Sequence, residues 1–196
     1  MIHVERIVNS VFTSNMYVIT SDDSNDVWLV DVGDFHKVTD ILSPSSIVKG
    51  VFLTHTHFDH IYGINMLLVR FPAMGVYLAE QGKEALYSSK KNLSYYHESP
   101  LVFEGENVHL LKEGDKVKIF NELEIYPIGV PGHTIDSMAF LLGNALFTGD
   151  AYIPNTPVVT NLPTGNKMQA YQSRMRIIDV AKGKTIYPGH GDSEVM

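Results

Sequence analysis

Residues 54–60, with the sequence Thr-His-Thr-His-Phe-Asp-His, place three imidazoles and one carboxylate within six consecutive positions. They follow directly on the apolar stretch 47–53, which is typical of a buried strand. Polar groups crowded at the end of such a strand cost free energy unless they are compensated, and histidine nitrogen and aspartate oxygen are common metal ligands. The segment therefore predicts a metal site, and the alternative is a solvated loop that is rich in histidine.

Three further candidate ligands lie far downstream, and each stands beside a glycine. They are His133 after Gly132, Asp150 after Gly149, and His190 after Gly189. Each follows a short β-like run, over residues 123–130, 145–148 and 185–187. Glycine lets the backbone approach closely, and strand ends present side chains rigidly. We expect these residues to join the histidine motif in one site.

Composition limits the class of protein. At 196 residues with 44% hydrophobic content, the chain suits one globular domain over residues 1–196. A formal charge of −7 with only 15 Lys and Arg argues against nucleic acid as a partner, because phosphate contacts require clustered cations. The absence of cysteine excludes disulfides, thiolate ligands and a cysteine nucleophile.

The expected location is the cytoplasm. The first residues contain no basic region followed by a long apolar core, and no apolar run approaches the length of a membrane span. We expect a small-molecule substrate and no membrane partner, and the sequence leaves the oligomeric state open.

The first half of the chain alternates strand-like and helix-like runs. We expect strands over residues 27–33 and 47–54, a helix over 61–71 ended by Pro72, a strand over 76–79 and a helical run over 81–94.

The second half is mostly β-like. Five short strands, over residues 108–111, 116–120, 123–130, 138–142 and 145–148, predict a meander with Gly143-Asn144 as a hairpin turn. Met168, Tyr171, Met175 and Ile178 recur at helical spacing, and we expect this stripe to be core before a last strand over 185–187. The element order predicts an α/β protein with two stacked sheets and helices outside both.

The motifs together resemble those of the metallo-β-lactamase-fold hydrolases, and within them the glyoxalase II (hydroxyacylglutathione hydrolase) branch. The matching segments are residues 31–34, 54–60, 131–134, 146–150 and 187–191. The resemblance implies an αββα four-layer sandwich, which agrees with the layers expected from the element order.

The resemblance also implies a ligand set for two divalent metal ions. One ion would take His55, His57 and His133, the other Asp59, His60 and His190, and Asp150 would bridge them. We expect Zn, with Fe or Mn as alternatives. A hydroxide between the two ions would attack the substrate, and Asp59 would act as the catalytic residue that orients its proton.

Three other residues are candidates with an ordinary alternative. Asp31 ends a strand and is expected to orient a ligand histidine through its other ring nitrogen, whereas the alternative is a turn aspartate bonded to its own loop. By the resemblance to lactonases, Tyr152 would donate a hydrogen bond to a substrate carbonyl, and the alternative is packing. His97 lies in a connection that can contact substrate. His3, His36 and His109 are interpreted as ordinary histidines.

The resulting functional prediction is a binuclear metal-dependent hydrolase of a thioester of the hydroxyacylglutathione type. A lactonase or other ester hydrolase would use the same ligands, and a metal-binding module with little turnover is the alternative from another class. Antibiotic β-lactam hydrolysis is disfavoured, because such enzymes commonly use cysteine or arginine where Asp150 or His60 stands.

Two departures from the glyoxalase II pattern concern the surroundings of the site. His133 is followed by Thr-Ile-Asp-Ser instead of Thr-Pro-Gly. The sequence ends six residues after His190, so we do not expect the glutathione contacts that a C-terminal helical extension provides in that branch.

Overall fold

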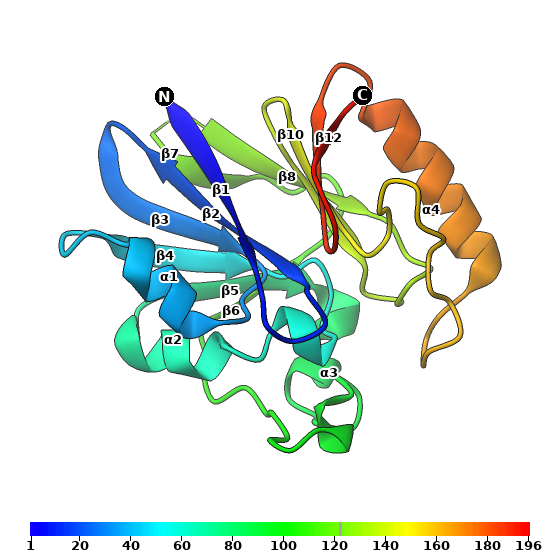
Figure 1. Cartoon of the computed structure of the whole chain (residues 1–196), viewed down its shortest axis with the longest axis horizontal. Helices are drawn as coiled ribbons and strands as arrows, with labels where there is room; N and C mark the ends of the chain where they lie inside the picture. Colours follow the sequence, from blue (N-terminus) through cyan, green and yellow to red (C-terminus); the bar gives the residue numbers. More distant parts are fainter. Residues whose placement is uncertain (122) are drawn as a thin grey trace.

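A computed structural model of the chain describes residues 1–121 and 123–196. Two six-stranded sheets pack face to face, with α1 (Phe35–Ile41) and α2 (Ile64–Arg70) on the outer side of one and α4 (Lys167–Val180) on the outer side of the other (Figure 1). This confirms the predicted four-layer α/β arrangement. Among the described residues, no helix combines the length and apolar character that crossing a membrane requires.

The strands of the first sheet follow the order of the chain. They are β1 (Ile2–Val8), β2 (Asn15–Ser21), β3 (Ser24–Val30), β4 (Ile47–Phe52), β5 (Gly75–Ala79) and β6 (Val108–Leu111). β1, β2 and β3 pair antiparallel, and β3 to β6 pair parallel.

The second sheet is built mainly of an antiparallel meander. In spatial order its strands are β12 (Glu194–Val195), β11 (Thr185–Pro188), β10 (Ala145–Gly149), β9 (Met138–Leu142), β8 (Leu123–Gly129) and β7 (Val117–Phe120). Leu142 pairs with Ala145, which confirms the two-residue turn between β9 and β10. The remaining elements are the short helix α3 (Lys83–Leu86) and the 3₁₀ turns η1 (Phe58–His60), η2 (Glu80–Gly82) and η3 (Ser94–Tyr96).

Apolar side chains fill the spaces between the layers. Aromatic residues from both sheets meet in the middle, including Trp28 and Phe52 from the first sheet and Phe140 and Phe147 from the second. A second cluster lies between the first sheet and the helices α1 and α2, and a third lies between the second sheet and α4. β4 is buried on both faces towards its end, as its almost continuous apolar run predicts for a central parallel strand.

The predicted phase of the last helix is wrong. Met168, Tyr171 and Met175 are 67%, 63% and 50% exposed, so they face solvent. The helix buries Ala170, Ser173 and Ile177 instead, and Ile178, the fourth residue of the predicted stripe, is partly buried against the apolar cluster under α4. Small side chains occupy the buried face because the helix approaches the loop before β9 closely: a Cβ added at Gly132 would lie 2.2 Å from the Ala170 nitrogen.

Three other predicted elements also differ from the structure. Residues 108–111 do not begin the meander but join the first sheet, because β6 pairs parallel with β5. The helix expected over 61–71 begins at Ile64, because Gly63 packs against the carbonyl oxygen of Gly33. Of the helical run expected over 81–94, only Lys83–Leu86 is α-helical.

The two sheets are joined at the edge that carries the histidine motif. The Met138 amide donates to the Thr54 carbonyl oxygen at 2.8 Å, and the Asn15 amide donates to that of Gly189 at 2.6 Å. These bonds bring residues 54–60 of the first sheet against the strand ends of the second.

Candidate metal centre

The seven predicted ligands come from loops at this one edge of the sandwich. Residues 54–57 leave β4 in an extended conformation, and η1 carries the next ligands. The others follow β8, β10 and β11. The complete set is His55, His57, Asp59, His60, His133, Asp150 and His190. The structure therefore brings together every residue that was expected to bind metal.

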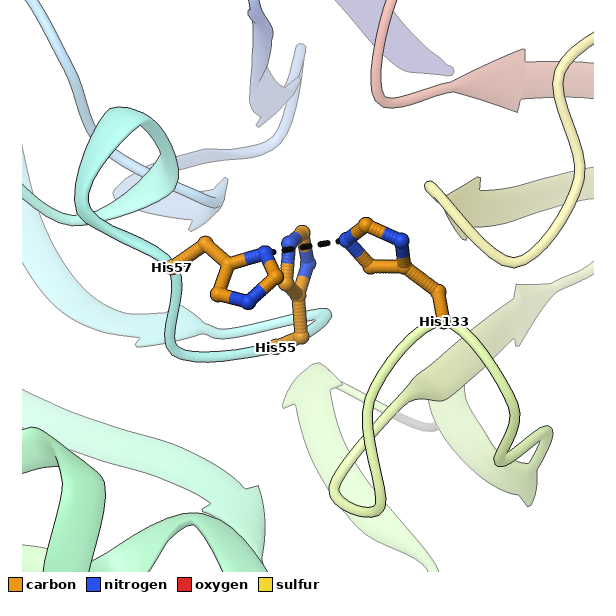
Figure 2. A group of neighbouring side chains, drawn as sticks. All are labelled: His55, His57 and His133. Carbon is orange, nitrogen blue, oxygen red and sulfur yellow. Dashed lines mark hydrogen bonds between the residues drawn. The ribbon is translucent and has the colours of Figure 1, made fainter. Parts of the chain in front are cut away.

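The ligand atoms form three overlapping groups, each with all its atoms within 4.8 Å of one another. The first is His55, His57 and His133, whose rings converge from the motif loop and the loop after β8 (Figure 2). His133 Nε2 lies 2.9 Å from His57 Nδ1. The sequence spacing places both motif histidines on one side of the extended segment.

The second and third groups share His60. One consists of His55, His60 and Asp150, and the other of Asp59, His60 and His190. His190 Nε2 lies 3.3 Å from Asp59 Oδ2 and 3.5 Å from Asp150 Oδ2. Asp150 thus stands between the two histidine clusters. Gly189 is required here, because a Cβ at that position would lie 2.1 Å from Asp150 Oδ1.

Three of these polar atoms are buried without a hydrogen-bond partner among the described residues. They are His55 Nε2, His60 Nε2 and Asp150 Oδ1. Buried polar atoms are nearly always paired, and an unmet one costs about 1–3 kcal/mol. All three belong to a single group, so a cation placed among them would satisfy them at once. The donor set therefore fits a divalent metal.

Asp31 fixes two of the histidines, and it does so from a fully buried position. Its Oδ2 accepts hydrogen bonds from His60 Nδ1 and Thr54 Oγ1, each at 2.8 Å, and its Oδ1 accepts from the Thr54 amide. Because the Thr54 hydroxyl proton is committed to Asp31, His55 Nδ1 donates to Thr54 Oγ1 at 3.1 Å. Both rings then turn a lone pair on Nε2 towards the site, as metal-binding histidines require.

His133 is fixed by a different element. Its Nδ1 donates to the Val159 carbonyl oxygen at 2.8 Å, which leaves Nε2 as the nitrogen that faces His57. The loop that carries His133 is tied to the start of α4, where the Asn166 amide donates to the Gly132 carbonyl oxygen. Sequence reasoning missed Thr54 and Val159, and no side-chain pattern could reveal a backbone acceptor.

A second buried hydrogen bond links the two loops that carry the first group of histidines. Thr56, between His55 and His57, donates its hydroxyl to Asp136 Oδ2 at 2.8 Å. Asp136 stands in the segment where this chain departs from Thr-Pro-Gly. The departure thus supplies a carboxylate that is 6% exposed and holds the histidine motif against the loop after β8.

The electrostatics of the site separate its histidines into two kinds. Burial and the neighbouring imidazoles hold the pKa of His55 well below its usual value and lower the pKa of His57 to about 4. Burial also disfavours charge on His60, but three surrounding carboxylates outweigh it and raise its pKa. Burial is likewise outweighed at His190, where hydrogen bonds to two carboxylates raise the pKa to about 9. At those two rings a proton and a cation compete for the same Nε2.

The remaining candidates lie outside the ligand groups. His97 stacks on Phe58 with ring centroids 4.6 Å apart, and it also touches Phe12. Tyr152 is 6% exposed and belongs to the apolar cluster under α4, with the Arg174 guanidinium 4.8 Å from its ring centroid. The structure gives Tyr152 a packing role, and contact of either residue with substrate stays a prediction.

Comparison with known proteins identifies the family to which the chain belongs. The sequence model of the Metallo-beta-lactamase superfamily matches residues 9–190, which include all seven candidate ligands. A probable metallo-hydrolase of Streptococcus pyogenes is 27% identical over 206 aligned residues, which cover 100% of this chain and 87% of the relative.

Two further similarities concern a curated enzyme and a solved structure. The hydroxyacylglutathione hydrolase of Psychromonas ingrahamii is 32% identical over 149 residues, and the match spans 69% of this chain and half the length of that enzyme. The crystal structure of the B3 metallo-β-lactamase BLEG-1 superposes with a TM-score of 0.88 at 23% identity, covering 98% of this chain and 93% of that protein. The latter similarity establishes the fold alone.

Proposed function

Because the chain belongs to the metallo-β-lactamase superfamily, we propose that it is a binuclear metal-dependent hydrolase that cleaves a thioester of the hydroxyacylglutathione type. The similarity to a hydroxyacylglutathione hydrolase supports this choice of substrate class. The observation that carries the proposal is the position of Asp150 between two groups of histidines, together with the three unpartnered buried atoms around it.

The proposed ligand assignment follows the three groups of atoms. One ion would be held by His55, His57 and His133, and the other by Asp59, His60 and His190. Asp150 would bridge the two, since its group contains one histidine from each set. Imidazole nitrogens dominate the set, which favours zinc, and iron or manganese would suit the same ligands.

Two such cations, when bound, supply hydroxide at neutral pH and polarise the carbonyl that it attacks. The chain's own contribution is to orient these groups. Burial opposes charge on Asp59, but His60 and His190 hold the pKa of its carboxyl below the usual range, so it is ionised at neutral pH and would orient the proton of the attacking hydroxide. A thiolate is a weakly basic leaving group, so the reaction needs no strong general acid.

Hydrolysis of a lactone or another ester is the second enzymatic candidate, because it uses the same donors and differs only in the walls around them. A metal-binding module with little turnover is the candidate from another class. We propose a small-molecule substrate in the enzymatic cases, with neither a membrane nor a nucleic acid as partner.

A substrate panel on protein of known metal content tests the proposal. S-lactoylglutathione, an acyl homoserine lactone and bis(p-nitrophenyl) phosphate would be assayed with zinc, manganese and iron, with elemental analysis of the same samples. We expect two metal equivalents per chain and metal-dependent thioester cleavage. His57→Ala should reduce thioester cleavage by more than about 100-fold. The reason is that replacing a residue that only orients a metal ligand already lowers metal affinity or activity about 10–100-fold.

His36→Ala is the matched control, since this histidine is exposed on α1 and belongs to none of the ligand groups. It should leave turnover unchanged. Faster cleavage of the lactone would favour the ester hydrolase. Full metal occupancy without turnover of any substrate would favour the binding module, and a content of one metal would contradict the bridged pair.

A further inference from the structure

Beside the candidate metal centre, the loop after β10 and the helix α4 line an open surface cavity of about 440 Å³. The loop contributes the polar side chains of Asn155, Thr156 and Thr160, and the helix contributes Lys167, Tyr171 and Arg174. The cavity is therefore lined by two cations, hydrogen-bonding groups and one aromatic ring. Its residues belong to none of the groups of candidate metal ligands.

The two cations stand out in an acidic protein. The chain has a formal charge of −7 with only 15 Lys and Arg. In the part of the chain that the structure describes, neither Lys167 nor Arg174 forms an ion pair, whereas Arg176 on the same helix is paired with Glu113. Two unpaired cations at one cavity create a local positive potential that attracts anions.

Arg174 is also held in place without a carboxylate. Its guanidinium lies 4.8 Å from the ring centroid of the buried Tyr152. A guanidinium stacked on an aromatic ring keeps its planar set of donors oriented, so less conformational entropy is lost when it binds a carboxylate or phosphate. This arrangement prepares one side of the cavity for an anionic group.

The cavity shares a wall with the metal centre. Val158 and Thr160 line it, and the residue between them is Val159, whose carbonyl oxygen accepts the hydrogen bond from His133 Nδ1. Ala170 lines it from the helix side and packs against Gly132, next to His133. His133 and the backbone of Val159 thus stand between the cavity and the candidate metal site.

We propose that this cavity binds an anionic end group of the substrate, a carboxylate or a phosphate several bonds away from the carbonyl that is cleaved. The inference rests on the proposed hydrolase function. Because His133 and Val159 stand between the cavity and the metal centre, the anionic group would belong to the far end of a long thiol half, such as a tripeptide thiol or a nucleotide-bearing thiol. Lys167 and Arg174 would then set the substrate preference without touching the reacting atoms.

The test compares thioesters with one acyl group and different thiol halves. S-lactoylglutathione carries carboxylates, lactoyl-coenzyme A carries phosphates, and S-lactoyl-N-acetylcysteamine carries no charge. Lys167→Gln in the metal-loaded protein should lower kcat/KM for the anionic substrate about two- to fivefold, mainly through KM, because exposed ion pairs are worth up to roughly 1 kcal/mol. The neutral thioester should be unaffected. The anionic substrate that loses rate identifies carboxylate or phosphate as the ligand.

Arg174→Gln is the second variant, with a thermal unfolding curve to check the packing under it. Lys182→Gln is the matched control, because it removes the same charge beyond the other end of α4, where Lys182 pairs with Asp179. It should leave all three substrates unchanged. The proposal is overturned if Lys167→Gln and Arg174→Gln leave both anionic substrates unaffected, or slow the neutral one equally.

If the wild-type protein cleaves none of the three, the hydrolase proposal fails, and binding decides the question of the cavity separately. Calorimetric titration with S-hexylglutathione and with acetyl-coenzyme A would be carried out on wild-type protein and on Lys167→Gln. Binding of either probe that weakens in the variant supports an anion site. No binding, or binding of equal strength in both proteins, refutes it.

Discussion

Replacing Asp31 by asparagine tests whether this buried carboxylate prepares the histidines for metal. Its two oxygens accept three hydrogen bonds, from His60 Nδ1 and from the Thr54 hydroxyl and amide. An amide offers one acceptor oxygen, so whichever way it is turned, its NH₂ group faces at least one of these donors. Asparagine tolerates the left-handed backbone at this position, where φ is 58°, so the backbone itself is not perturbed.

The expected cost has two parts. Losing one of the bonds to a charged acceptor and weakening the other two should lower the free energy of unfolding by about 2–3 kcal/mol. Misorienting the two histidines that Asp31 fixes should weaken zinc binding about 10–100-fold, which is about 1.4–2.7 kcal/mol.

Zinc affinity is measured by competition with a chromophoric chelator, and stability by urea unfolding of the metal-free protein. Asp34→Asn is the control for zinc affinity, because Asp34 lies in the same motif but bonds to Ser10 and Tyr62 and to none of the site histidines. A folded Asp31→Asn protein whose zinc affinity is within about twofold of wild type would refute the reasoning. Loss of a group that orients two ligand histidines should weaken zinc binding at least about tenfold.

Three other predictions concern stability. Gly132→Ala should cost about 2–4 kcal/mol in urea unfolding, because φ is 140° and the new Cβ would lie 2.2 Å from the backbone of α4; a change below about 1 kcal/mol would contradict this packing. Ile177→Ala should lower the free energy of unfolding by about 2–4 kcal/mol and Met175→Ala by less than about 0.5 kcal/mol. The reason is that the two side chains are 2% and 50% exposed, respectively. Equal losses would mean that Met175 is buried, as the sequence pattern predicted. Burial opposes ionisation of Asp34, but hydrogen bonds to its carboxylate lower its pKa to about 2. The carboxylate should therefore contribute up to about 2 kcal/mol to the free energy of unfolding above pH 4, and this contribution should be lost as the pH falls to 2. If the stability difference between wild type and Asp34→Asn stays constant over this range, the carboxylate is not responsible.

The sequence predicted which candidate ligands lie close together better than it predicted the elements that support them. Residues 54–60 could be recognised because imidazoles and a carboxylate have few other reasons to crowd at a strand end. Thr54 lies within the motif, yet its part in connecting Asp31 to His55 depends on where one hydroxyl proton points. The bond from His133 to the Val159 carbonyl oxygen joins residues 26 positions apart and uses a backbone atom that every residue possesses.

The errors in the fold have physical causes that local patterns do not contain. β6 resembles the strands that follow it, and its parallel pairing with β5 depends on contacts across about 30 residues of chain. In α4, the apolar residues at helical spacing are mainly methionine and tyrosine, which predicted that their face would be buried. The helix instead buries the face with alanine and serine, because only small side chains fit where the helix approaches Gly132 closely. Packing distance, which a hydropathy pattern does not include, decided the orientation of that helix.

The distribution of the ligands along the chain has a consequence for biosynthesis. Four of them lie between residues 55 and 60, but the others follow at 133, 150 and 190. The centre therefore cannot close before residue 190 has been synthesised, and until then the emerging polypeptide displays a partial set of histidines beside an uncovered aromatic sheet face. Metal captured by that early fragment would lack His133 and His190, so we expect the complete centre to take up metal only after residue 190 has emerged and folded.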